Sequence, residues 1–293
     1  MIRKNVTKWV AVVLMLCVAF TFAACGQKPA STPVNDGAKT AEPTKAQSTP
    51  AAETKLDKIK KAGKLVVGTS ADYAPYEFHT MINGKDTIVG FDIEIAKEIA
   101  KDLGVKLEIE DIGFDGLLQA LKADKVDFVI AGMTPNEERK KEVDFTKIYY
   151  YAKQGVMVRT EDKDKLKTIA DLKGKKVGAQ LTTEQEKIVN KQMPDAKLVS
   201  LTKIPDLVLE LKNKKVDAIV VELPVANGYV KKNSDLVVSD IKVEEDTGGS
   251  AIAVKKGNTE LAAAMDKTLD RLLKDGTIDK FVAEANELNE VKK

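Results

Sequence analysis

The chain has 293 residues, with 47 Lys and Arg against 45 Asp and Glu, so its formal net charge at neutral pH is only +2. The acidic and basic residues are interspersed, which argues against nucleic-acid binding and against electrostatic attachment to a membrane surface. Beyond residue 54 about 240 residues remain, enough for one large or two moderate lobes.

Residues 1–24 are predicted to be a secretory signal peptide. They open with a short basic segment that holds Arg3, Lys4 and Lys8. An almost unbroken apolar run follows from Val10 to Phe22, shorter than the roughly 20 residues that a membrane-spanning helix needs. A basic start, a short apolar run and small residues at its end are typical of an exported protein. Without this segment, which carries three basic side chains and no acidic one, the formal charge of +2 becomes −1.

The segment 22–25 (FAAC) resembles the lipobox of bacterial lipoproteins. The resemblance implies that Cys25 is acylated and becomes the first residue of a mature chain held on the extracytoplasmic face of the cell membrane. The other cysteine is Cys17, inside the apolar run, so the mature chain offers Cys25 no disulfide partner. Ordinary signal cleavage, with Cys25 as an incidental residue, is the alternative. Residues 25–54 then form a flexible tether, because four prolines among small and polar residues bury too little surface to offset the entropy of ordering.

From residue 55 onwards, short apolar strands alternate with amphipathic helices. The pattern predicts a strand at 64–68, a loop at 69–76, a helix from Asp92 that ends at Gly104, and a strand at 105–109. A second series begins later in the chain, with a strand at 175–178, a helix at 183–192 and a strand at 198–201. Alternation at this spacing indicates βαβ units and mainly parallel sheets.

One segment occurs twice. Residues 117–130 (LLQALKADKVDFVI) reappear as residues 207–220 (LVLELKNKKVDAIV), and each copy predicts a short amphipathic helix, a polar turn and a buried strand. The first copy continues to Thr134, with Arg139 close behind, whereas the second continues to Glu222. Two lobes built alike, one presenting a cation and the other a carboxylate, indicate a cleft for a ligand that carries both charges.

The end of the chain returns to the first lobe. A strand at 251–254 and helices at 260–274 and 278–288 show no sign of a third lobe, so the chain is expected to cross between lobes near 149–153 and near 241–247. We therefore predict an α/β fold of two lobes, each a mainly parallel sheet flanked by helices. Lobe one is predicted to hold residues 55–150 and 246–293, and lobe two residues 151–245.

The ends of the predicted strands suggest how the ligand is held. Ligands bind at the carboxyl ends of strands in open parallel sheets. Segments 134–137 (TPNE) and 183–186 (TEQE) there have the pattern of a helix capping box, with Thr134 and Thr183 as caps. A helix N-terminus and the guanidinium of Arg139 suit a carboxylate, and Glu222 suits an ammonium. Together they predict a site for an α-amino acid.

Arginine is scarce, since Arg3, Arg139, Arg159 and Arg271 are the only four among 47 basic residues. The planar fork of Arg139 is therefore expected to matter, whereas Arg159 and Arg271 are expected to lie on the surface. Tyr73, Tyr76 and Phe114 follow strands, where together they suit the wall of a side-chain pocket, whereas each taken alone favours a core or rim position. The acids Asp72, Glu77 and Glu184 favour Arg or Lys as the ligand, while Ser70 also suits Gln.

The chain resembles the polar amino-acid substrate-binding proteins of ABC importers, solute-binding protein family 3. The resemblance runs in order from about residue 56 to 288. Its motifs are 68–76 (GTSADYAPY), 90–96 (GFDIEIA), 113–118 (GFDGLL), 126–134 (VDFVIAGMT), 138–139 (ER), 143–146 (VDFT), 171–178 (DLKGKKVG) and 275–277 (DGT). It implies a periplasmic-binding-protein-like fold of type 2, with two crossovers, that closes on an amino acid and docks as a monomer on a membrane permease.

The resemblance also implies roles for single residues. Arg139 matches the carboxylate-binding arginine, Gly132 and Thr134 match backbone and hydroxyl contacts to the same carboxylate, and Thr183 matches the backbone contact of the second lobe. Glu222 stands where the family usually has Asp for the α-amino group, and Tyr73 and Phe114 match an aromatic pair around the side chain. Departures at Ser70, Ala131, Gly132 and Glu184 leave the ligand side chain open.

Enzymatic function is the main alternative. A dehydratase on the same fold would need a general acid or base in the cleft, but His79, the sole His, lies in a segment predicted to be an exposed polar turn. The sequence shows no Ser-His-Asp set, metal cluster or phosphate loop, so no catalytic residue, metal or cofactor is predicted. A sensor or adhesin that binds an amino acid without transport is the third hypothesis.

Overall fold

The computed structural model describes residues 53–244 and 248–290. The predicted signal peptide, Cys25 and nearly all of the predicted tether lie outside the described residues. None of the helices that are described is long and apolar enough to cross a membrane.

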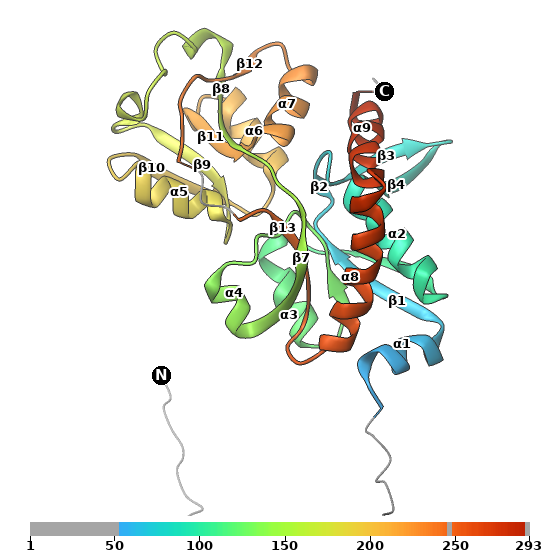
Figure 1. Cartoon of the computed structure of the whole chain (residues 1–293). Helices are drawn as coiled ribbons and strands as arrows, with labels where there is room; N and C mark the ends of the chain where they lie inside the picture. The colour runs from blue at the N-terminus through green and yellow to red at the C-terminus, as the bar shows by residue number, and fades with distance from the viewer. Residues whose placement is uncertain (1–52, 245–247, 291–293) are drawn as a thin grey trace, which may run out of the picture. The chain divides into compact units, whose positions relative to one another are not determined.

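Two five-stranded sheets form the centres of the two lobes (Figure 1). The first has the order β5-β1-β6-β13-β7. Its strands are β1 (Lys64–Thr69), β5 (Lys106–Asp111), β6 (Phe128–Val129), β7 (Val143–Tyr150) and β13 (Ser250–Lys255). The second has the order β10-β9-β11-β8-β12. Its strands are β8 (Gln154–Arg159), β9 (Lys176–Gln180), β10 (Lys197–Leu201), β11 (Ala218–Glu222) and β12 (Leu236–Val238).

Each sheet is parallel apart from one strand, which confirms the predicted fold class. In lobe one β1 pairs in parallel with β5 and β6, and β13 runs antiparallel to β6 and β7. In lobe two β9 pairs in parallel with β10 and β11, and β8 runs antiparallel to β11 and β12. The chain passes to the second sheet between β7 and β8 and returns between β12 and β13. The predicted boundary at residue 246 lies outside the described residues, and the lobe limits stay a prediction.

Helices pack on both lobes. Those of lobe one are α1 (Lys55–Ala62), α2 (Phe91–Leu103), α3 (Leu117–Lys122), α4 (Glu137–Glu142), α8 (Thr259–Lys274) and α9 (Thr277–Glu290). Those of lobe two are α5 (Glu184–Gln192), α6 (Ile204–Lys212) and α7 (Leu223–Lys232). Short 3₁₀ turns lie at Phe114–Gly116, Thr160–Asp162 and Ile169–Leu172. The stripe predicted on α2 is buried at Ile95 and Ile99, and Gly104 ends the helix in the left-handed conformation that glycine adopts easily.

The duplicated segment has the same local geometry in both lobes. It forms α3 and β6 in lobe one and α6 and β11 in lobe two. Asp127 Oδ2 accepts a hydrogen bond from Val66 N at 2.8 Å, and its counterpart Asp217 accepts one from Lys176 N at 2.9 Å. Each aspartate thereby ties the turn after the helix to the neighbouring strand. The prediction of a repeated helix, turn and strand is confirmed.

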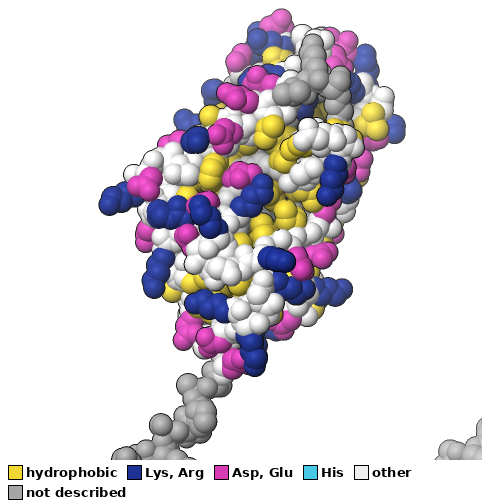
Figure 2. All heavy atoms as spheres, turned by 90° about the vertical axis from the view of Figure 1, so that its right-hand side faces the viewer, with side chains coloured by type: hydrophobic (Ala, Val, Ile, Leu, Met, Phe, Trp, Pro, Cys, Tyr) yellow, Lys and Arg dark blue, Asp and Glu magenta, His cyan; other side chains and the backbone are white. Residues whose placement is uncertain are grey.

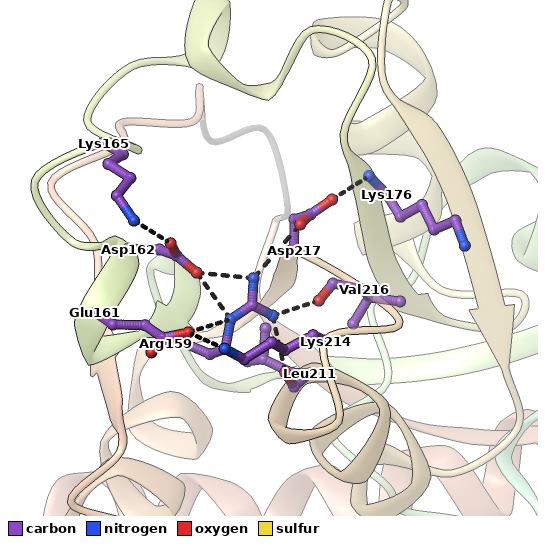
Figure 3. A network of polar contacts seen from close by, with 9 residues as sticks. All are labelled: Arg159, Glu161, Asp162, Lys165, Lys176, Leu211, Lys214, Val216 and Asp217. Atoms are coloured by element: carbon purple, nitrogen blue, oxygen red, sulfur yellow. Dashed lines mark hydrogen bonds and ion pairs between the residues drawn. The ribbon is translucent and has the colours of Figure 1, made fainter.

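The cation beside this turn differs between the lobes, and it corrects the prediction for Arg159. Lys55 pairs with Asp127 at 2.7 Å in lobe one, whereas in lobe two the arginine at the end of β8 takes this place (Figure 3). Arg159 is only 8% exposed and donates to the carbonyl oxygens of Leu211 at 2.9 Å and Val216 at 2.7 Å. It is not a surface residue, because it is the buried donor for one carbonyl at the end of α6 and one in the turn before β11.

A three-stranded sheet was missed by the sequence prediction. It consists of β2 (Asp72–Tyr73), β3 (Glu77–Ile82) and β4 (Lys85–Val89). The turn between β3 and β4 is Asn83-Gly84, with φ of 52° and 77°, which is the backbone that a two-residue hairpin favours. His79 therefore lies on a strand and not in a polar turn. Its ring nitrogens lie 3.0 Å from Asp86 Oδ2 and 3.1 Å from Asp111 Oδ2.

Charged side chains of both signs are interspersed on the face shown in Figure 2, and hydrophobic side chains gather near its middle. This face carries no large area of a single charge. Both signs of charge are thus mixed on this face, as the balanced composition predicts.

Candidate ligand-binding site

A cavity between the two lobes collects the residues that the sequence singled out. All nine predicted site residues lie on its wall, and they are Ser70, Tyr73, Phe114, Gly132, Thr134, Arg139, Thr183, Glu184 and Glu222. About 380 Å³ of space, part of it open to solvent, lies between the walls, but a water molecule can centre itself in only about 20 Å³ of it. The walls are therefore close together, and the enclosed space is far smaller than the roughly 300–1,000 Å³ typical of ligand sites. Their role in binding stays a prediction.

The cationic side of the cavity is formed by Arg139 on α4. This residue is 9% exposed. Its guanidinium donates to Thr134 O in lobe one and to Thr182 O in lobe two, each at 2.8 Å. The guanidinium carbon also lies 5.3 Å from the centre of the Phe114 ring, within the range of a cation–π contact. Arg139 is thus held at the junction of the two lobes.

The helix starts on this side differ in detail from the prediction. The cap of α4 is Asn136, whose Oδ1 accepts from Arg139 N at 2.8 Å, and not Thr134. A residue that precedes proline is biased towards extended backbone, which moves the helix start beyond Pro135. Thr183 occupies the cap position of α5 as predicted, but its hydroxyl donates to Gln180 O at 2.6 Å.

The start of α5 is consequently open towards a ligand. Among the described residues no side chain caps it at Thr183. Glu186, the last residue of the predicted box, accepts instead from Thr182 N at 2.5 Å. The amide groups in the first turn of a helix and the helix dipole attract an anion. A carboxylate between α5 and Arg139 would meet donors from both lobes.

The opposite side of the cavity is acidic and buried. Glu222 ends β11 and is 5% exposed, and Glu77 on β3 is fully buried. Within the described part of the chain, Glu222 Oε2 and both carboxyl oxygens of Glu77 have no hydrogen-bond partner. Burying an unpaired carboxylate is costly. Burial accordingly raises the pKa of Glu222 to about 7 and raises the pKa of Glu77 well above its ordinary value. Glu222, predicted from sequence to meet an ammonium, therefore has one buried carboxyl oxygen without a partner, and its role in binding stays a prediction.

Asp92 supports this side from behind the cavity. Its Oδ2 accepts from Gly132 N at 2.9 Å and from Tyr149 Oη at 2.8 Å. Gly132 has a φ of 55°, and an added Cβ would lie 3.4 Å from the Tyr73 ring. The amide of Gly132, predicted to contact a carboxylate, is therefore engaged by Asp92. Burial raises the pKa of Asp92 to about 7.

Further contacts join the lobes at the rim of the cavity. Asn136 Nδ2 donates to Glu184 Oε1 at 2.5 Å, and Lys187 Nζ lies 2.7 Å from Glu138 Oε2. Each pair links α4 in lobe one to α5 in lobe two. Glu184, proposed from sequence as an acid for a ligand side chain, therefore already has a partner in the other lobe.

Five wall residues were not in the predicted site, and they are Asp72, Glu77, Ala131, Gln180 and Gln185. Asp72 and Glu77 were recognised only as nearby acids. Gln180 ends β9, so the rule that ligands bind at the carboxyl ends of strands could have found it. Gln185 lies in the first turn of α5 and donates to Gln154 Oε1 at 2.8 Å, a contact that no local pattern announces.

Comparison with known proteins identifies the family. Residues 65–285 match the bacterial extracellular solute-binding proteins, family 3. The chain belongs to this family. The arginine-binding extracellular protein ArtP of Bacillus subtilis (strain 168) is 37% identical over 279 residues, which cover 94% of this chain and 96% of that protein.

Two further family relatives show the same likeness. ABC transporter arginine-binding protein 1 of Escherichia coli (strain K12) is 36% identical over 223 residues, 75% of this chain and 89% of that protein. Among solved structures, the amino acid ABC transporter substrate-binding protein AbpA from Streptococcus pneumoniae Canada MDR_19A, bound to L-arginine, is 40% identical. It superposes with a TM-score of 0.78 and covers 80% of this chain and 100% of its own.

Proposed function

We propose that this chain is the extracytoplasmic receptor of an ABC importer and that it binds an α-amino acid with a cationic side chain, arginine foremost. The observation that carries the proposal is the division of charge in one cavity. Arg139 stands on one side, and the buried, unpaired carboxyl oxygens of Glu77 and Glu222 stand on the other.

The charges of arginine suit both sides. Its carboxylate would meet Arg139 and the start of α5, and its ammonium would meet Glu222. A guanidinium offers Glu77 paired donors and a charge that favours its ionised form, whereas a neutral side chain leaves Glu77 protonated and offers it no such pairing. The cavity therefore favours a ligand with two cationic groups and one anionic group over a neutral amino acid such as glutamine.

The relatives support the same ligand. Two curated relatives are named as arginine-binding proteins, and the solved relative from Streptococcus pneumoniae is bound to L-arginine. Two of these three proteins are named as parts of an ABC transporter, which supports a receptor that leaves its ligand chemically unchanged.

The proposal includes a membrane anchor and a permease. The FAAC segment supports acylation of Cys25, and the proline-containing stretch behind it would tether a monomeric receptor near its permease. Lipid on Cys25 is testable by mass spectrometry of the membrane-extracted protein. A Cys25→Ser variant should be released from the membrane, and an unmodified Cys25 in the membrane fraction would contradict the anchor.

A thermal-shift screen of the twenty amino acids tests the ligand. A ligand at 100 times its dissociation constant stabilises the folded state by about 2.7 kcal/mol. We expect arginine to raise the Tm most and lysine less. Glu222→Gln should lose most of this shift, while Glu210→Gln, on α6 but outside the cavity wall, should keep it. A larger shift with a neutral amino acid would contradict the proposal. Recovery of unaltered arginine after incubation would separate a receptor from an enzyme.

A further inference from the structure

Helix α6 of lobe two begins without a capping side chain of its own. Its cap position is Lys203, which provides no acceptor, and its second residue, Pro205, has no amide hydrogen. The first residue, Ile204, is 1% exposed, so bulk water cannot satisfy its N–H. A buried amide without an acceptor is costly, and this helix start therefore needs an acceptor from elsewhere.

Asp72 of lobe one supplies that acceptor. Its Oδ2 accepts from Ile204 N at 3.2 Å, across 132 positions of sequence. Its backbone oxygen also lies 3.5 Å from the hydroxyl of Tyr229 on α7, another helix of lobe two. Asp72 belongs to β2, in the small sheet beside lobe one. Asp72 thus contacts two helices of the other lobe, α6 at its first residue and α7 at Tyr229.

The position of Asp72 connects these contacts to the ligand cavity. Its side chain lines that cavity and also a second cavity of about 420 Å³, whose wall includes Pro205 and Tyr229. Ser70, another residue of the ligand cavity, lies 3.4 Å from Asp72 Oδ1. The interlobe contact is therefore next to the place where a ligand side chain would lie. Asp72 Oδ2 forms this contact, whereas Asp72 Oδ1 is the oxygen near Ser70.

We propose that Asp72 is a positioning residue that couples amino-acid binding to lobe closure by capping α6 of the opposite lobe. The hydrogen bond to Ile204 requires the lobes to be close, so it stabilises the closed arrangement and not an open one. Because a ligand enclosed by both lobes leaves only when they separate, the cap slows release. The inference rests on the proposed function, and it assigns to Asp72 a role that differs from holding the ligand's cation.

Two substitutions separate the cap from a direct charge contact. Asp72→Ala removes both the acceptor and the charge, whereas Asp72→Asn keeps an acceptor and removes only the charge. Asn caps helices about as well as Asp, and loss of a cap corresponds to a change of about 2- to 30-fold in an equilibrium constant. Stopped-flow and calorimetric measurements with arginine provide the rates and the dissociation constant. Asp206→Ala, an exposed acid on the same helix turn, is the matched control.

We expect Asp72→Ala to weaken arginine binding by about 2- to 30-fold, through faster dissociation at an unchanged association rate. We expect Asp72→Asn and the control to stay within about twofold of wild type and to bind more tightly than the Ala variant. An Asn variant as weak as the Ala variant would overturn the cap and assign Asp72 to the ligand's cation. Unchanged binding by the Ala variant would also overturn it. If Ala fails to fold, Asp72→Ser, which keeps a capping oxygen, must bind like Asn. Wild-type protein that binds no amino acid would refute the proposed function, and this inference with it.

Discussion

Removal of the Arg139 guanidinium should abolish most of the affinity for an amino acid. The side chain is 9% exposed and is fixed by hydrogen bonds of 2.8 Å to Thr134 O and Thr182 O, one from each lobe. Arg139→Ala would leave a ligand carboxylate with the start of α5 alone. It would also remove the link that the guanidinium makes between the two lobes.

The magnitude follows from the burial of this group. Truncating one partner of a buried, hydrogen-bonded charge pair costs about 2–5 kcal/mol. At 1.36 kcal/mol per tenfold change, this corresponds to a loss of about 30-fold to several thousand-fold in affinity. Arg139→Lys keeps the charge but cannot donate in two directions from a planar fork, so it should recover only part of the loss.

Isothermal titration calorimetry with arginine measures this effect directly. Arg271→Ala is the matched control, because Arg271 is also on a helix but pairs with Glu98 and Asp102, each at 2.8 Å, outside the cavity wall. The control should bind like wild type. If Arg139→Ala bound arginine as tightly as the control, the assignment of the carboxylate site would be wrong.

Two further predictions concern charge. Burial raises the pKa of Glu222 to about 7 from 4.5, so arginine affinity should fall as the pH drops through 7, by up to tenfold per unit, and Glu222→Gln should flatten the profile. The effect on the stability of the unliganded protein has the opposite sign. Protonated Glu222 contributes at most about 3 kcal/mol to the free energy of unfolding at acid pH, and this contribution is lost as the pH rises through 7. A Tm of unliganded protein that shows no difference in pH dependence between wild type and Glu222→Gln would contradict this. Separately, Arg159→Met should lower the free energy of unfolding by about 3 kcal/mol in urea titrations and leave arginine affinity unchanged; a loss below 1 kcal/mol would mean that the buried network is not needed.

The sequence predicted correctly the features that follow from local periodicity and from position at the end of a strand. The repeated helix, turn and strand at 117–130 and 207–220 predicted two similar lobes, and the structure forms them as α3–β6 and α6–β11. Strand ends then pointed to Arg139 and Glu222, which line one cavity. Such features follow from periodicity and sheet geometry, both of which a single sequence contains.

Other features depend on contacts between distant segments. The burial of Arg159 results from carbonyls of Leu211 and Val216, more than fifty positions away, and no pattern around Arg159 indicates it. Asp72 meets Ile204 only when the two lobes are assembled. The β3–β4 hairpin is different. Asn83-Gly84 between two short strands is a strong local signal for a hairpin, and the sequence prediction overlooked it.

The most direct test of the central claim compares arginine with citrulline, which has nearly the same shape but a neutral side chain. Calorimetry should show arginine binding at least about 30-fold more tightly, because both ligands present the same ammonium to Glu222 but citrulline offers the buried Glu77 no charged partner. Equal affinity for the two, or a preference for citrulline, would contradict a cavity built for a cationic amino acid.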